Sequence, residues 1–140
     1  MKIKVVGAEP GGARGMKLIR SVCRKGLSAV LLESLEAAQR YGVLEAAAAD
    51  IAGSFDERPF AQNMKRYVCG TAVHAERRIH EMADALALLD ELGSSTRMTR
   101  STRAKLQDVT KMAPREKLNA RGPDNIATVM EADVAVSAKH

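Results

Sequence analysis

The sequence predicts an all-α fold, and its composition and periodicity are the observations behind this prediction. Of the 140 residues only 3% are aromatic, with no tryptophan, while the apolar fraction of 46% is rich in alanine, leucine and methionine. These residues favour helices, whereas strands favour β-branched and aromatic residues. Apolar residues also recur every three or four positions, as one buried helical face requires. At this length we expect one domain with a hydrophobic core.

The longest predicted helix begins at Pro10 and ends near Tyr41. Pro10 and the two following glycines interrupt the preceding pattern and allow a sharp turn of the backbone. The apolar residues of this stretch then follow helical spacing, and we expect them to form its buried face: Ile19, Cys23, Leu27, Val30, Leu31, Leu35 and Ala38.

A polar stripe occupies another face of this helix. It consists of Lys17, Ser21, Arg24 and Ser28, with Arg20 beside them. The positive end of the helix dipole and the neighbouring arginines both favour the neutral form of a lysine in the first turns. Such a lysine suits proton transfer, and the same surroundings suit anion binding. A solvated stripe on a core helix is the alternative interpretation.

The same region carries a resemblance to a known family. Its residues are Val5-Val6-Gly7, Pro10-Gly11, Ala13, Lys17 and Arg20-Ser21. They are similar to a junction in the β-hydroxyacid dehydrogenase and 6-phosphogluconate dehydrogenase superfamily. From about Val5 to about Met112, the chain resembles the helical C-terminal domain of a poorly characterised NAD(P)-dependent oxidoreductase branch. The resemblance implies a 6-phosphogluconate dehydrogenase C-terminal-domain-like helical bundle.

The resemblance also implies roles for individual residues. In such enzymes a Rossmann domain holds the cofactor, and its last strand leads through a glycine turn into a long helix with a proton-transferring lysine. Lys17 corresponds to that lysine and is the implied catalytic residue. The implied substrate-binding residues are Ser21, which stands where the family has an amide, the preceding Arg20, and Gly12. His80-Glu81 stand where the family has a lysine-aspartate pair that helps at the cofactor or the substrate, and they are the implied cofactor-binding residues.

Five further elements are expected. An alanine-rich helix spans residues 44–52 and is closed by Gly53; the next is capped by Ser54 or Asp56, with Pro59 in its first turn. This helix turns Phe60, Met64, Tyr67 and Val68 inward and breaks at Gly70-Thr71. A further helix covers residues 72–92 and is ended by Gly93, and another follows the loop at residues 94–96 and ends near Met112. A short helix covers residues 125–136 after an Asp124 cap.

The predicted organisation has three parts. Residues 1–9 alternate apolar and lysine side chains and are expected to be a remnant of the last Rossmann strand and its turn. Residues 10–113 form the helical substrate and dimerisation domain. Residues 114–140 form a linker and a short helix or tail.

Several functional classes are disfavoured. His74 and His80 are six apart, on different sides of a helix, so we expect no metal site. No stretch is long and apolar enough to span a membrane, and no signal peptide is evident, so we expect a cytoplasmic protein with Cys23 and Cys69 as buried reduced thiols. Despite the net charge of +5, we interpret the basic face of residues 97–105 as a solvated surface and do not expect nucleic-acid binding.

Two functions follow from these observations. The first is the substrate-binding and dimerisation half of a NAD(P)-dependent oxidoreductase that acts on a small acidic substrate. No dinucleotide-binding glycine fingerprint is present, so NAD or NADP is expected only with a separate Rossmann-domain subunit, and not on this chain alone. The second is a non-catalytic helical interaction module. Both predict a homodimer.

Overall fold

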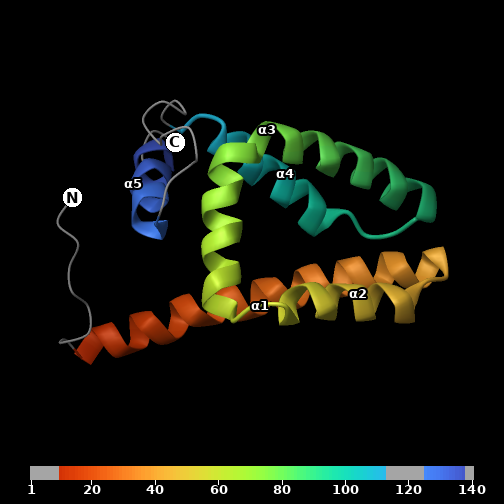
Figure 1. The fold of residues 1–140 in the computed structure, drawn as a ribbon, viewed down its shortest axis with the longest axis horizontal. Coiled ribbons are helices and arrows are strands. Elements are labelled where there is room, and N and C mark those ends of the chain that lie inside the picture. The colour runs from red at the N-terminus through yellow and green to blue at the C-terminus, as the bar shows by residue number, and fades with distance from the viewer. Residues whose placement is uncertain (1–9, 113–124, 138–140) are drawn as a thin grey trace.

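The computed structural model describes residues 10–112 and 125–137, and this part of the chain is all helical. Figure 1 shows its five helices: α1 (Pro10–Tyr41), α2 (Leu44–Asp56), α3 (Phe60–Leu92), α4 (Arg97–Val109) and α5 (Ile126–Ser137). The predicted all-α class is therefore confirmed. The strand remnant expected over residues 1–9, the Asp124 cap and most of the expected linker lie outside the described residues.

The helices are arranged around α1. The chain turns at residues 42–43, and α2 runs back along the C-terminal half of α1 (Figure 1). The first half of α3 then leads away from α1, and its second half packs with α4 in the most extensive helix pair of the fold. The first turns of α1 project beyond α2 and α4 (Figure 1).

Two glycines end helices where the sequence predicts it. Gly42 follows α1 with a φ of 84°, and Gly93 follows α3 with a φ of 66°. Both angles lie in the left-handed region, which glycine adopts without a Cβ clash. After α3, the N–H groups of Gly93 and Ser94 donate to the carbonyls of Asp90 and Leu89 at 3.1 and 2.9 Å. These bonds satisfy carbonyls that the end of a helix leaves free.

The boundary between α2 and α3 differs from the prediction. α2 continues through Gly53 to Asp56, because a glycine costs a helix only about 1 kcal/mol and keeps its backbone hydrogen-bonding groups. Ser54 and Asp56 therefore lie inside α2 and do not cap α3, whose N-cap is Pro59 without a side-chain hydrogen bond.

Asn63 secures this corner instead. Its side chain is fully buried, and its Nδ2 donates to the carbonyls of Phe55 at 2.9 Å and Arg58 at 3.4 Å. One amide thus joins the end of α2 to the first turn of α3. A cap supplied from inside the following helix has no signature in the local sequence.

The kink in α3 lies at His74, with φ −111° and ψ 18°, and not at Gly70-Thr71. Gly70 has another role, because a Cβ there would come within 3.3 Å of Nη2 of Arg78. The Arg78 guanidinium also donates to the Thr71 hydroxyl. The missing side chain at Gly70 therefore makes room for an arginine from beyond the kink.

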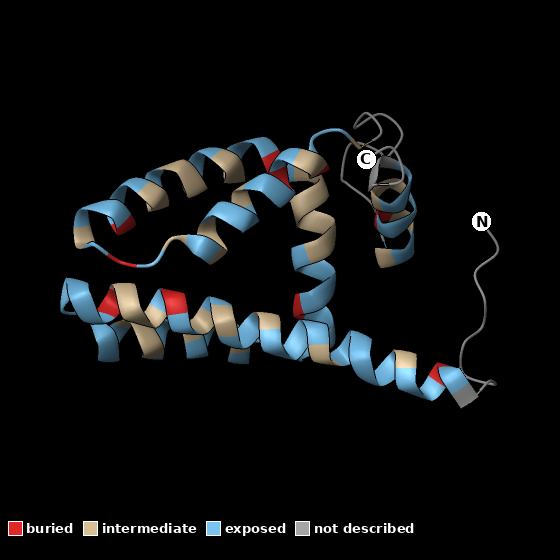
Figure 2. Ribbon diagram, turned by 180° about the vertical axis from the view of Figure 1, so that it is seen from behind, coloured by how far each residue is buried: buried red, intermediate tan, exposed pale blue. Residues whose placement is uncertain are grey.

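The core of the described chain is small. Figure 2 shows few buried positions, and the buried apolar residues are Ala38, Ala75, Leu89, Leu106, Val109 and Val129. Of the residues expected inward, Ile19 is 67% exposed, Phe60 50%, and Met64 and Tyr67 42% each. Cys23 is exposed and Cys69 half-buried, both as free thiols. Those expectations are wrong for one chain, because helical periodicity identifies an apolar stripe without specifying what covers it.

Candidate functional site

The predicted catalytic and substrate-binding residues lie in the projecting half of α1. Lys17 and Arg20 are exposed, Ser21 is half-buried and Gly12 is buried. The spacing of Lys17, Arg20 and Ser21 within little more than one helical turn places them on one side of α1. In the described ranges, no carboxylate forms an ion pair with Lys17, Arg20 or Arg24. These cations are therefore available to an anionic ligand.

His80 and Glu81 lie elsewhere, in the second half of α3, and both are exposed. Glu81 forms an ion pair with Arg77, one helical turn earlier, at 3.6 Å. Figure 1 shows this half of α3 well separated from the first turns of α1, so a single chain does not bring the two predicted groups together. Among the described residues, no group of three or more His, Cys, Asp or Glu side chains is arranged to hold a metal ion.

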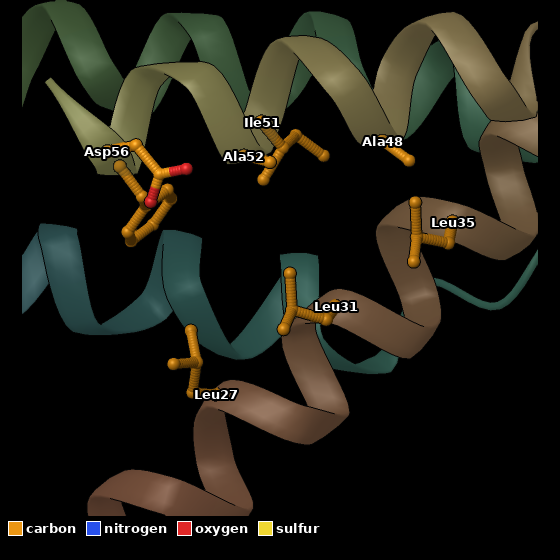
Figure 3. A pocket seen from close by; sticks show the side chains of 8 residues that line it. Leu27, Leu31, Leu35, Ala48, Ile51, Ala52 and Asp56 are labelled. Carbon is orange, nitrogen blue, oxygen red and sulfur yellow. The ribbon is translucent and has the colours of Figure 1, made fainter.

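An apolar groove runs between α1 and α2, with a volume of about 260 Å³. Figure 3 shows Leu27, Leu31 and Leu35 of α1 facing α2 across it. The α2 side is lined by Ala48, Ile51, Ala52, Phe55 and Asp56. Short alanine side chains opposite long leucines leave this space open. We refer to it below as the α1–α2 groove.

Three cations continue the same face of α1. Arg24 precedes Leu27 by three positions, Arg20 precedes Arg24 by four, and Lys17 precedes Arg20 by three. Residues three or four apart on a helix are neighbours on its surface. Lys17, Arg20 and Arg24, here called the cationic stripe, therefore extend from one end of the α1–α2 groove. The sequence alone predicts Arg24 and Leu27 on different faces of α1, because Ile19 and Cys23 also follow the leucine spacing.

A second polar centre, which sequence reasoning missed, joins α1 to α4. The carboxylate of Glu33 is buried, and its Oε1 accepts hydrogen bonds from Oγ of Ser95 at 2.9 Å and the N–H of Met98 at 3.0 Å. Its Oε2 accepts from the N–H and Oγ1 of Thr99, both at 2.7 Å. The N-cap of α4, Thr96, makes no side-chain capping bond, so Glu33 caps α4 from another helix.

The surroundings of Glu33 fix its charge. Burial raises the pKa of its carboxyl, but the hydrogen bonds from Thr99, Met98 and Ser95 lower it more, so the net pKa lies below the ordinary value. An ionised carboxylate with both oxygens already occupied is suited to holding helices together and not to accepting a substrate proton. Its sequence signal is a single acid between Leu32 and Leu35 on an apolar helix.

Beside Glu33, a cavity of about 300 Å³ separates α1 from α3 and α4. It is lined by Val30, Glu33, Ser34, Met82, Ala85, Leu88, Leu89, Met98, Thr99 and Thr102. Because Glu33 already uses both oxygens, this cavity offers few free polar groups.

Within the described ranges, no helix has both the length and the apolar character needed to cross a lipid bilayer.

Fold and site together define a helical domain with a cationic helix face beside an apolar groove. Residues 38–109 match the model of a family described as a domain of unknown function, DUF1932. This match covers just over half of the chain, and the chain belongs to that family. It extends from the last turn of α1 to the end of α4, so it includes His80 and Glu81 and begins after Lys17.

A relative in Methanothermus fervidus, the uncharacterised 28.5 kDa protein in the 7S RNA 5′ region, is 30% identical over 82 residues. The aligned segment covers 59% of this chain and 32% of the relative, so the chain spans about a third of that protein's length. No solved structure matches the chain.

Proposed function

We propose that this chain is the substrate-binding and dimerisation part of a NAD(P)-dependent oxidoreductase that acts on small hydroxy acids. Its DUF1932 family is associated with the C-terminal helical region of NAD(P)-dependent hydroxyacid dehydrogenases, which supports the proposal. The observation that carries it is the cationic stripe, which lies exposed on a continuous helix with no carboxylate partner in the described chain.

The side chains of α1 suit this chemistry. Lys17 would be the proton-transfer residue for the substrate hydroxyl, and the guanidinium of Arg20 would bind the substrate carboxylate in a bidentate manner. Ser21 would hydrogen-bond the substrate from one helical turn after Lys17. A bound nicotinamide would supply the hydride acceptor.

The cofactor would be held outside the described residues. In the described ranges no strand leads into a glycine-rich turn, which is the usual binding site for dinucleotide phosphates. The relative from Methanothermus fervidus extends well beyond the aligned segment, which leaves room for a further domain in that protein. We therefore propose a Rossmann domain supplied by another polypeptide or by a further part of the same one, and no tight binding of NAD or NADP by this chain alone.

The test is a dehydrogenase assay on the chain joined to the Rossmann domain of a family member that carries both parts. We expect oxidation of some 2- or 3-hydroxy acids, and a loss of about 10²-fold or more in kcat for Lys17→Ala. Lys65→Ala, which replaces an exposed lysine of α3, serves as the control and should keep wild-type activity. An inactive fusion with the wild-type sequence, or a fully active Lys17→Ala variant, would contradict the proposal.

The second candidate function is a non-catalytic helical interaction module. The large exposed apolar side chains of α1 favour it: Met16, Leu18, Ile19, Val22 and Leu32 are between 55% and 74% exposed. This alternative predicts that Lys17 is dispensable and that association between chains persists without any nucleotide.

A further inference from the structure

We propose that the α1–α2 groove binds the hydrocarbon tail of the substrate, so that the preferred acids carry a medium-length acyl chain. This inference rests on the proposed function in one respect, because it assigns the substrate carboxyl group to the same cationic stripe. The groove would hold the tail, while Lys17, Arg20 and Arg24 would bind the head.

The shape and chemistry of the groove suit a single hydrocarbon chain. Apart from Asp56, its lining consists of leucine, isoleucine, alanine and phenylalanine side chains (Figure 3). Its volume of about 260 Å³ is just below the roughly 300–1,000 Å³ of sites for drug-sized ligands. Leu27, at the end nearest the cationic stripe, is 37% exposed, so a tail can enter from that side.

The charges at that end complement an acid. From Lys17 to Arg24 the helix rises about 10 Å, which places three cations in line with the groove within reach of one head group. Asp56, the single carboxylate in the lining, is outnumbered by these cations. An amphiphilic carboxylate matches this arrangement, in which a charged surface is followed by an apolar one. A short acid would leave the leucines of the groove uncovered.

The groove is also distinct from the other exposed apolar surface of α1. Leu18 and Val22 are offset from Leu27 by nine and five positions, which turns them away from the leucines that line the groove. A second copy of the chain can therefore cover Leu18 and Val22 without closing the groove.

Isothermal calorimetry on the full chain tests the proposal with 3-hydroxybutyrate, 3-hydroxyhexanoate and 3-hydroxyoctanoate below their micellar concentrations. We expect affinity to rise with length, by up to about threefold to fourfold per buried methylene. The methyl ester of 3-hydroxyoctanoate should bind at least about tenfold more weakly than the acid, because it lacks the charge that the cationic stripe attracts. Equal affinities for all three acids would overturn the proposal.

Two matched pairs of variants locate the site. Ala52→Phe should fill the groove and remove the length dependence, while Ala49→Phe, also exposed on α2 but outside the lining, should not. Arg24→Gln should weaken all three acids by a similar factor, whereas Lys25→Gln should leave them unchanged. An Ala52→Phe variant that binds the three acids like wild type would overturn the proposal. A change in the oligomeric mass of this variant would also overturn it, because it would show that a second copy of the chain fills the groove.

The outcomes separate this inference from the proposed function. Length-dependent binding with an inactive Rossmann fusion would support the groove and contradict the dehydrogenase. Lys17-dependent oxidation without any preference for longer acids would support the dehydrogenase and contradict the groove.

Discussion

The carboxylate of Glu33 accepts two hydrogen bonds from Thr99, one from its backbone N–H and one from Oγ1, both at 2.7 Å. Glu33 lies in α1 and Thr99 in the first turn of α4, so these residues join segments 66 positions apart. This polar contact therefore ties the first turn of α4 to α1 across a long stretch of the sequence.

Removal of this carboxylate is expected to destabilise the fold. In Glu33→Ala the N–H groups of Met98 and Thr99 lose their acceptor in a buried place, and we expect a loss of about 2–3 kcal/mol in the free energy of unfolding. Urea denaturation followed by circular dichroism measures it. Glu36→Ala, whose side chain is 40% exposed, is the matched control and should lose about 0.5 kcal/mol or less. Equal losses in both variants would contradict the role of Glu33.

Stability should also depend on pH through Glu33. Its pKa in the folded chain is lowered below the ordinary value of 4.5, so this group stabilises the fold above that value and the contribution is lost as pH falls through the folded pKa. We expect the difference in unfolding free energy between wild type and Glu33→Gln to shrink when urea denaturation is repeated at pH 7, 5 and 3.5. A difference that stays constant over this range would show that the charge of Glu33 is not involved.

Two glycine substitutions should have opposite effects. Gly42→Ala introduces a Cβ at a φ of 84° and should destabilise the chain by about 1 kcal/mol. Gly53→Ala lies inside α2 with open space around the new Cβ, and should stabilise it by about 0.5–1 kcal/mol. Thermal melts of the two variants provide the comparison, and a stabilising Gly42→Ala would contradict the left-handed turn.

We expect a homodimer that covers the outer face of α1. Leu18 is 55% exposed, Val22 74% and Leu32 72%, and their spacing places them on one side of the helix. Light scattering at micromolar concentration should therefore give twice the chain mass of 15.1 kDa. Val22→Glu should reduce the mass to one chain, while Ser28→Glu, on the polar stripe, should not. A wild-type mass of one chain would refute the prediction.

Local features of the fold could be predicted from the sequence. Both ends of α1 and the end of α3 were predicted correctly, because Pro10, Gly42 and Gly93 act through their own backbone angles. The start of α3 was not, because it depends on Asn63 reaching carbonyls five and eight residues away. Predictions therefore held where a residue determines its own conformation.

In the candidate site, too, features set by one helix could be predicted, and features that need contacts between helices could not. Helical spacing predicted that Lys17, Arg20 and Ser21 share one side of α1, and the structure places them so. The α1–α2 groove could not be predicted, because it exists only when Ala48 and Ala52 lie opposite the leucines of another helix. Glu33 was missed for the same reason, since its partners are more than 60 positions away in the sequence.

The bend of α3 at His74 has a consequence for the order in which the chain can assemble. After His74 the helix continues for 18 residues, about 27 Å, before it ends at Leu92. The bend directs this segment back over α1, where the carbonyl of Leu92 accepts a hydrogen bond from Nη1 of Arg40 at 3.4 Å. A straight α3 would carry the start of α4 far from Glu33. The contact between Glu33 and Thr99 therefore reports on the angle at His74, and α4 can dock on α1 only once that angle has formed.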